Sequence, residues 1–216
     1  MFCMILSFAM KTGITVILVD MGGVLARHED SCMEKALLHD FGLQGFDNFS
    51  QLDESLPELL LLLSKSIIDE KQMWEMFTRK TGKVVPHYDG SLWAKYFHPS
   101  IDADMLSLLV RLKQDGYRVV CATNTEPAHY AYHMNHGQYE VFDTVYASCI
   151  IKKAKPEEAF FTHILDAEGI EAGNALLVDD TLVNCRSAER LGIQAVRYTG
   201  ISQLREKIIH IGILDK

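Results

Sequence analysis

Asp20 combines a reactive side chain with a position that suits chemistry. It follows the apolar run Ile14–Val19 and precedes Gly22 and Gly23. A carboxylate can attack phosphorus and form an acyl phosphate that water then opens. The glycines let the backbone approach a ligand and offer amide donors to phosphoryl oxygens. Asp20 is therefore the candidate nucleophile, with a capping aspartate followed by turn glycines as the structural alternative.

Thr123 and Asn124 form a second polar cluster, after the apolar run 117–122. The Thr123 hydroxyl can donate to a phosphoryl oxygen, and Asn124 can position the leaving oxygen. The same residues also suit the N-cap of the helix expected after them. Their position at the end of a predicted strand, like that of Asp20, favours substrate binding.

Lys155 supplies the positive charge that such a reaction needs. It stands directly before Pro156, at the expected start of a helix. A cation held there would stabilise negative charge on the nucleophile and the phosphate together. Lys152 and Lys153 lie close by, so a solvated basic run is the alternative. Pro156 favours the catalytic interpretation because it is expected to fix the helix start right after Lys155.

Asp179 and Asp180 follow the apolar residues 176–178. Two adjacent acids at the end of a buried strand repel each other unless a cation lies between them and Asp20. Carboxylate oxygens, together with water and phosphate, suit Mg²⁺. Capping of the next helix, which its dipole would favour, is the alternative. The sequence thus predicts a Mg²⁺ site that includes Asp20, Asp179 and Asp180.

These clusters need a scaffold that brings them together, and the sequence alternates strand and helix patterns. Strands are expected at 14–19, 117–122, 144–147, 175–178 and 194–198, and helices at 101–115, 127–135, 156–168, 182–191 and 202–209. This alternation predicts an α/β fold, a Rossmann-like parallel sheet with helices on both faces. Sites in such sheets lie at the carboxyl ends of the strands, so the four clusters are expected to converge.

The segment between the first two strands is helical in pattern. Helices are expected at 31–41, 68–80 and 91–97, and a capping box of Ser55 and Glu58 ahead of the five-leucine run 59–63. We expect a Rossmann-like core of residues 1–25 and 101–216, with a small helical cap of residues 26–100 inserted after the first strand. The leucine run is expected to be buried in the cap, with a dimer face as the alternative.

Composition excludes several function classes. The chain has 216 residues and a net charge of −8, so nucleic-acid binding lacks electrostatic support. Five scattered cysteines without a C-x-x-C pattern argue against disulfides and zinc and fit a cytoplasmic protein. The apolar residues 1–10 are too short to span a membrane, and we expect an extension of the first strand or a true start at Met10. The oligomeric state is left open.

One histidine pattern and two tryptophans suggest other binding sites. His129, His133 and His136 recur on one face of a predicted helix, a spacing that zinc could use. No H-E-x-x-H motif accompanies them, so an ordinary, partly exposed helix face is expected. Trp74 and Trp93 are expected to pack in the cap, with the lining of a substrate pocket as the alternative.

The four clusters together resemble a known family. In order and spacing they match the four motifs of the haloacid dehalogenase (HAD) superfamily, as Asp20-Met21-Gly22-Gly23-Val24, Thr123-Asn124, Lys155-Pro156, and Asp179-Asp180 with Asn184. Residues 121–125 and Ser148-Cys149 are most similar to the branch with the soluble epoxide hydrolase N-terminal phosphatase and bacterial sugar-phosphate phosphatases.

The resemblance implies a Rossmann-like core with a helical cap, and a role for each residue. Asp20 would be the nucleophile, Thr123 the phosphoryl-binding hydroxyl and Lys155 the stabilising cation. Asp180, beside Asp179, and the Gly22 carbonyl would be metal ligands.

Two positions depart from the family pattern. Phosphatases of this family usually carry a second Asp, the general acid and base, where this chain has Gly22; such help is worth on the order of 10²–10⁴-fold. Some members of the branch also carry Gly there, and aryl, acyl or anomeric sugar phosphates would lose least. The branch also usually has a glycine where Lys152 stands.

The sequence therefore predicts a Mg²⁺-dependent phosphatase of a small phosphorylated metabolite, with an aspartyl-phosphate intermediate and no nucleic-acid or membrane partner. Dehalogenation is one alternative, and carbon–phosphorus cleavage, with Lys65 or Lys71 as the Schiff-base donor, is another. A third is a catalytically weak binding or regulatory module. Substrate choice is assigned to the cap, whose residues identify no substrate.

Overall fold

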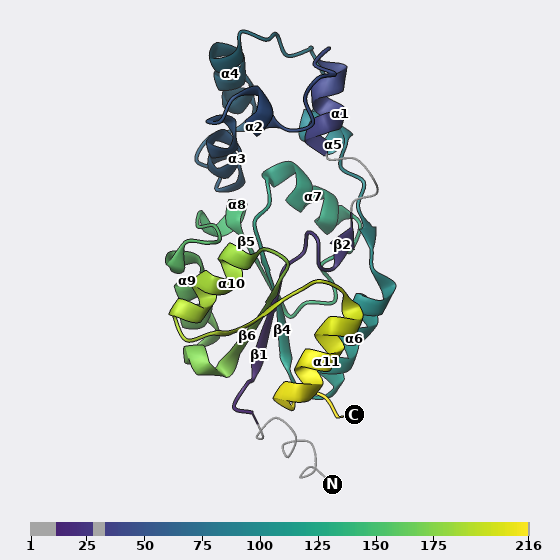
Figure 1. Cartoon of the computed structure of the whole chain (residues 1–216), viewed down its shortest axis with the longest axis vertical. Helices are drawn as coiled ribbons and strands as arrows, with labels where there is room; N and C mark the ends of the chain where they lie inside the picture. The colour runs from purple at the N-terminus through teal and green to yellow at the C-terminus, as the bar shows by residue number, and fades with distance from the viewer. Residues whose placement is uncertain (1–11, 28–32, 216) are drawn as a thin grey trace.

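The computed structural model describes residues 12–27 and 33–215, and its centre is a five-stranded parallel sheet (Figure 1). The strand order is β5-β4-β1-β6-β7, which confirms the predicted α/β class. The strands are β1 (Val16–Val19), β4 (Arg118–Thr123), β5 (Thr144–Ala147), β6 (Ala175–Asp179) and β7 (Gln194–Arg197). The expected extension over residues 1–10 and the choice of Met10 as start lie outside the described residues.

Helices cover both faces of this sheet because successive β1 residues point to opposite sides. Ile17 and Val19 pack in one cluster with residues of α6 (Ala103–Gln114) and α11 (Ile201–Ile211). Leu18 packs in the other cluster, with residues of α9 (Glu158–Glu168) and α10 (Leu182–Arg190). The all-buried strand β1 is typical of a parallel sheet that is covered on both faces.

A helical region lies above the carboxyl edge of the sheet in Figure 1 and fits a cap. It runs between β2 (Ala26–Arg27) and β3 (Ser100–Ile101), which pair antiparallel. Its helices are α1 (Met33–Asp40), α2 (Phe49–Leu52), α3 (Leu56–Ser64), α4 (Glu70–Thr81) and α5 (Leu92–Lys95). These helices share a hydrophobic cluster of their own. The domain limits at residues 26 and 100 stay a prediction.

The interior of the cap is aromatic and leucine-rich. Trp93 is buried, and Trp74 stacks on it at 5.5 Å between ring centroids, as expected for packing residues. In α3 the side chains of Leu56, Leu59 and Leu63 are buried, whereas Leu61 is exposed. The leucine run is therefore a one-sided core face rather than a fully buried segment.

Some local predictions were wrong at the helix starts. The Ser55 side chain makes no capping hydrogen bond at α3 and instead donates to Asp53 Oδ1. The capping box is at α4, where Asp69 and Gln72 bond each other's backbone amides. A short helix α8 (Ser148–Ile151) was not predicted, and α9 begins after Glu157, so Pro156 lies before the helix.

Two further elements complete the described fold. The helix α7 (Pro127–Asn135) has the predicted limits and lies between the sheet and the cap in Figure 1. A short 3-10 helix η1 (Ala172–Asn174) precedes β6. Among the described residues, no helix has the length and apolar character needed to cross a membrane.

Candidate active site at the carboxyl edge of the sheet

The sheet register places Asp20 beside Asp179, as the motif order predicts. Val19 lies opposite Val178 in β6, so the next residue of each strand emerges at the same edge. The ammonium group of Lys155 lies between the two carboxylates. Lys155 Nζ is 2.9 Å from Asp20 Oδ1 and 2.7 Å from Asp179 Oδ2. All three side chains are buried, so this is a desolvated ion-pair network rather than a surface contact.

Burial and charge act in opposite directions on this network. Burial, helped by the nearby Asp179 charge, raises the pKa of Asp20 from 3.8 to about 7, although Lys155 opposes the rise. Burial alone would lower the pKa of Lys155, but the two aspartates outweigh it and raise that pKa above its ordinary value. The lysine is therefore held in its charged form, while an additional positive charge near Asp20 would favour its ionised form.

The Asp179 carboxylate is fixed by donors on all sides. Oδ1 accepts hydrogen bonds from the Thr181 amide and from Asn184 Nδ2, at 2.9 and 3.0 Å. Oδ2 accepts from Lys155 Nζ and, more weakly, from the same Asn184 group at 3.2 Å. Asp179 and Asn184 thus hold the lysine in place, a task that the sequence alone did not assign to Asp179.

Three carboxylates form a set of oxygen donors. Ligand atoms of Asp20, Asp179 and Asp180 lie within 4.8 Å of one another. Asp20 Oδ1 accepts from the Met21 amide and Lys155, but Oδ2 receives no donor from the described residues. The Gly22 carbonyl likewise accepts no hydrogen bond from the part of the chain that the structure describes. Hard, partly unengaged oxygen atoms of this kind fit Mg²⁺, which takes carboxylates together with water and phosphate.

The two glycines have different surroundings. The Gly23 amide donates to Ala26 O at 2.9 Å, so it is already engaged. Gly23 has φ +73°, and a Cβ there would collide with the Asp180 carboxylate. Its contribution is therefore space for Asp180 rather than a donor for phosphate. Gly22, in contrast, has no atom within 4 Å of the position that a Cβ would occupy.

Thr123 lies at the end of β4, where its side chain is buried. Its hydroxyl makes only a long contact, 3.4 Å, with the Asn124 carbonyl, so it keeps donor capacity for a ligand. The Asn124 amide is already bonded at both ends to the main chain of Lys155. Nδ2 donates to Lys155 O and Oδ1 accepts from Lys155 N, each at 2.8 Å.

Lys152 and Lys153 do not join the ion-pair network. Lys152 is exposed and ends α8 with φ 57° and ψ 28°. This left-handed conformation is one that glycine adopts without steric strain. The glycine that the family resemblance implies at this position would fit this backbone conformation.

The histidine face of α7 belongs to the packing of the cap. His129 and His133 are buried, so the expectation of a partly exposed face was wrong for them and correct only for His136. The His129 ring stacks on Phe97 with centroids 3.7 Å apart, and its Nδ1 is 2.8 Å from Glu126 Oε2. No histidine belongs to a cluster of metal-ligating side chains within residues 12–27 and 33–215.

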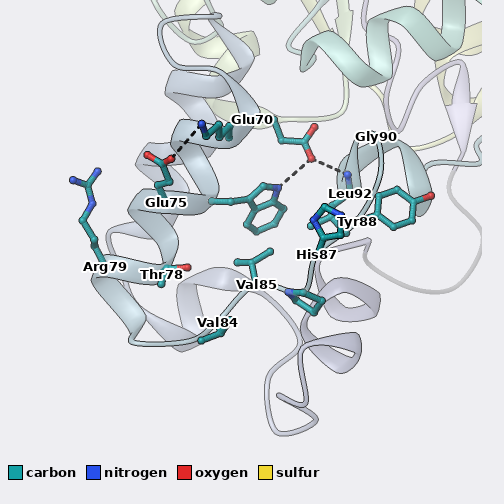
Figure 2. A pocket seen from close by; sticks show the side chains of 13 residues that line it. Glu70, Glu75, Thr78, Arg79, Val84, Val85, His87, Tyr88, Gly90 and Leu92 are labelled. Atoms are coloured by element: carbon teal, nitrogen blue, oxygen red, sulfur yellow. Dashed lines mark hydrogen bonds and ion pairs between the residues drawn. The ribbon is translucent and has the colours of Figure 1, made fainter.

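A cavity of about 770 Å³ lies in the helical region, between α4 and residues 84–92 (Figure 2). Its lining includes Trp74, Val84, Val85, Pro86 and Tyr88. Glu70, labelled in Figure 2, accepts hydrogen bonds from Trp74 Nε1 at 3.1 Å and from the Leu92 amide at 2.8 Å. Trp74 thus also lines a pocket, whose lining residues all belong to the cap; that this pocket binds the substrate stays a prediction.

Comparisons with known proteins agree with this geometry. Residues 14–192 match the family model described as a haloacid dehalogenase-like hydrolase. The sesquiterpene phosphatase astK of Aspergillus oryzae (strain ATCC 42149 / RIB 40) is 30% identical over 149 residues, which are 61% of this chain and 75% of that protein.

Solved structures show the same architecture. The HAD family enzyme BT-2542 of Bacteroides thetaiotaomicron, crystallised with magnesium and inorganic phosphate, is 25% identical with a TM-score of 0.63. The match covers 85% of this chain and 93% of that one. A HAD-like family hydrolase from Porphyromonas gingivalis is 23% identical with a TM-score of 0.70, over 90% of this chain and 98% of its own, and shows the fold alone.

Proposed function

Because this chain belongs to the haloacid dehalogenase-like hydrolase family, we propose that it is a Mg²⁺-dependent phosphatase of a small phosphorylated metabolite. The observation that carries the proposal is the buried Lys155 ammonium, held between Asp20 and Asp179 beside a third carboxylate. The magnesium and phosphate bound by the Bacteroides relative support it.

In the proposed reaction, Asp20 is the nucleophile. An Asp20 oxygen attacks phosphorus, a P–O bond to aspartate forms, and the P–O bond to the leaving alcohol breaks. Water then attacks the phosphorus of the aspartyl phosphate, which releases inorganic phosphate and restores the carboxylate. The Oδ2 atom is suited to the attack because Oδ1 is already held by Met21 and Lys155.

The remaining residues stabilise charge. Lys155 compensates negative charge on Asp20 and the phosphoryl group in a buried setting, where electrostatic stabilisation is strong. The Thr123 hydroxyl donates to a phosphoryl oxygen. Asp20, Asp180 and the Gly22 carbonyl, with Asp179 next to them, would hold Mg²⁺, which would supply further positive charge to the phosphate when bound.

The position of Gly22 determines which substrates react well. With no second carboxyl group at this position, the leaving oxygen departs without a proton from that side chain. Esters whose leaving group is a stable anion therefore depend least on proton donation to the leaving oxygen. Leaving-group acidity is expected to control the rate more strongly than in an enzyme with an acid at this position.

The test is turnover of p-nitrophenyl phosphate with Mg²⁺. Turnover is expected with the ion, loss of turnover with EDTA, and a loss of at least about 10³-fold in Asp20→Asn, because the amide is not a nucleophile. Circular dichroism should show that Asp20→Asn is folded. Full activity of Asp20→Asn, or turnover that is independent of Mg²⁺, contradicts the proposal. Intact folding with no turnover on any phosphate ester favours the binding-module alternative.

The carbon–phosphorus cleavage alternative receives no support from the cap lysines. Lys65 Nζ is paired with Glu157 at 2.7 Å, and the Lys71 side chain is 84% exposed. A Schiff-base lysine instead needs a desolvated, unpaired amine. Neither lysine has such surroundings.

We further propose that the substrate carries an apolar group, because the cap bears a solvent-open pocket with a largely apolar lining. The lining of this cavity combines Trp74, Val84, Val85 and Pro86. The relative from Aspergillus oryzae is described as a sesquiterpene phosphatase, so its substrate class has the same chemistry. A phosphorylated terpenoid alcohol is the matching candidate for this chain.

A further inference from the structure

Lys155 lies in a segment without regular secondary structure, so something else must fix its main chain. The Asn124 amide does so through two hydrogen bonds of 2.8 Å, one to the Lys155 carbonyl and one from its amide. This paired contact fixes both sides of one residue. The position of Lys155 Nζ between the carboxylates therefore depends on where Asn124 is held.

The neighbour of Asn124 is held in turn by Ser148, the first residue of α8. The buried Thr125 amide donates to Ser148 Oγ at 2.9 Å. Ser148 is fully buried and directly follows Ala147, which lies opposite Thr123 in the sheet. The serine thus connects the end of β5 to the loop that carries Asn124.

The Ser148 hydroxyl has one hydrogen and two acceptors within reach. Ser64 O, at the end of cap helix α3, is 2.7 Å away, whereas Thr125 O is 3.3 Å away. The closer acceptor takes the hydrogen, so the hydroxyl joins cap and core. If α3 moved away, the hydroxyl could turn to Thr125 O without leaving a buried donor unpaired.

The next residue of the cap contacts the segment that follows Lys155. Lys65 Nζ is 2.7 Å from Glu157 Oε1, two residues after Lys155. Adjacent residues of the cap therefore contact both flanks of the lysine segment, one through Ser148 and one through Glu157.

We infer that Ser148 is a positioning residue, which transmits the position of cap helix α3 through Thr125 and Asn124 to Lys155. The inference rests on the proposed phosphatase function of the site. Phosphoryl transfer would then be fastest when the cap lies where the structure places it, because here the Ser148 hydroxyl donates to Ser64 O while it accepts from the Thr125 amide.

The experiment compares Ser148→Ala with Ser64→Ala as a matched control. The Ser64 hydroxyl donates to Leu61 O within its own helix, so this control removes a buried hydroxyl but keeps the carbonyl that Ser148 contacts. For p-nitrophenyl phosphate with Mg²⁺, Ser148→Ala is expected to lower kcat about tenfold with little change in KM, the rate equivalent of one lost hydrogen bond. Ser64→Ala should stay within about twofold of the parent.

Two readouts separate positioning from general damage. If Ser148 acts through Asn124, the double variant with Asn124→Ala should be no slower than Asn124→Ala alone. Amide hydrogen exchange in residues 152–157 should accelerate in Ser148→Ala and not in Ser64→Ala. Equal kcat in the two serine variants, multiplied losses in the double variant, or unchanged exchange would overturn the inference. An inactive parent protein would end the proposed function instead, while the exchange experiment would still test the hydrogen-bond chain.

Discussion

Gly22 leaves room beside the nucleophile, which makes the missing acid a matter of chemistry rather than of packing. No atom lies within 4 Å of a Cβ built there, and its φ is not in the left-handed range. A Cβ at this position therefore fits without moving the backbone. Gly23 differs, because any side chain there meets Asp180.

We predict that Gly22→Asp raises kcat on the order of 10²-fold for alkyl phosphates and much less for p-nitrophenyl phosphate. The added carboxyl can protonate a poor leaving group, whereas nitrophenolate needs no proton. Steady-state kinetics on a series of esters with different leaving-group pKa values measure this effect. A plot of log kcat against leaving-group pKa should have a smaller slope for Gly22→Asp than for the parent protein. Gly22→Asn, of the same shape without the acid, is the control. An equal gain for all esters would show that the acid is not what this chain lacks.

Lys152 affects the stability of the protein through its backbone conformation. It ends α8 with φ 57°, and Ser66 is the other non-glycine with positive φ in the described ranges. A left-handed conformation costs roughly 1–2 kcal/mol for a residue with a Cβ. Glycine avoids that cost but loses more freedom on folding, about 0.4–1 kcal/mol.

At the level of the element, Lys152→Gly is therefore expected to raise the free energy of unfolding by about 0.5–1 kcal/mol, which raises Tm by roughly 1–4 °C. Lys153→Gly is the matched control. Because Lys153 has no positive φ, glycine relieves no strain there and should lower the free energy of unfolding by about 0.4–1 kcal/mol. Differential scanning calorimetry decides between these signs. Destabilisation by both glycines would mean that Lys152 is not strained in solution.

The elements that the sequence predicted correctly are those with a pattern long enough to read. The strands around Asp20, Thr123 and Asp179 and the helix 127–135 were found because each joins an apolar run to a polar end or a proline. The two-residue strands β2 and β3 and the four-residue helix α8 are too short to show a period.

The sequence predicted which residues form the candidate site, but it did not predict the hydrogen bonds that connect them. Motif order placed Asp20, Lys155 and Asp179 at one edge, because parallel strands end together. It could not show that Asp179 and Asn124 hold Lys155, since side-chain direction depends on contacts between residues that are 24 and 31 positions apart in sequence. The Asp69–Gln72 capping box of α4 was not predicted, and Ser55 forms no box at α3 because its hydroxyl donates to Asp53 Oδ1 two residues before it.

At the scale of the whole molecule, the proposed function places chemistry and substrate recognition in different regions. The carboxylates and Lys155 come from the sheet edge, whereas the apolar cavity comes entirely from residues 70–92. Substitutions in the cavity should therefore change the choice of substrate without changing the reaction itself.

We predict that Val84→Asp raises KM for farnesyl phosphate several-fold while kinetics on p-nitrophenyl phosphate stay within about twofold, because a charge in the apolar lining disfavours only the apolar substrate. The Val84 side chain lines the cavity yet is 81% exposed, so folding should tolerate the change. Val110→Asp, on an exposed position of α6, is the control. Loss of both substrates alike, or of neither, would remove the cavity from substrate recognition.

The antiparallel contact of Ala26–Arg27 with Ser100–Ile101 has a consequence for protein engineering and for evolution. It brings both ends of the inserted segment to one place, so an exchanged insert only has to begin and end a short distance apart. Chimaeras joined at the β2–β3 pair could combine the sheet and active-site residues of this enzyme with the inserted segment of another. Gene duplication followed by exchange of the insert could diversify such enzymes in the same way.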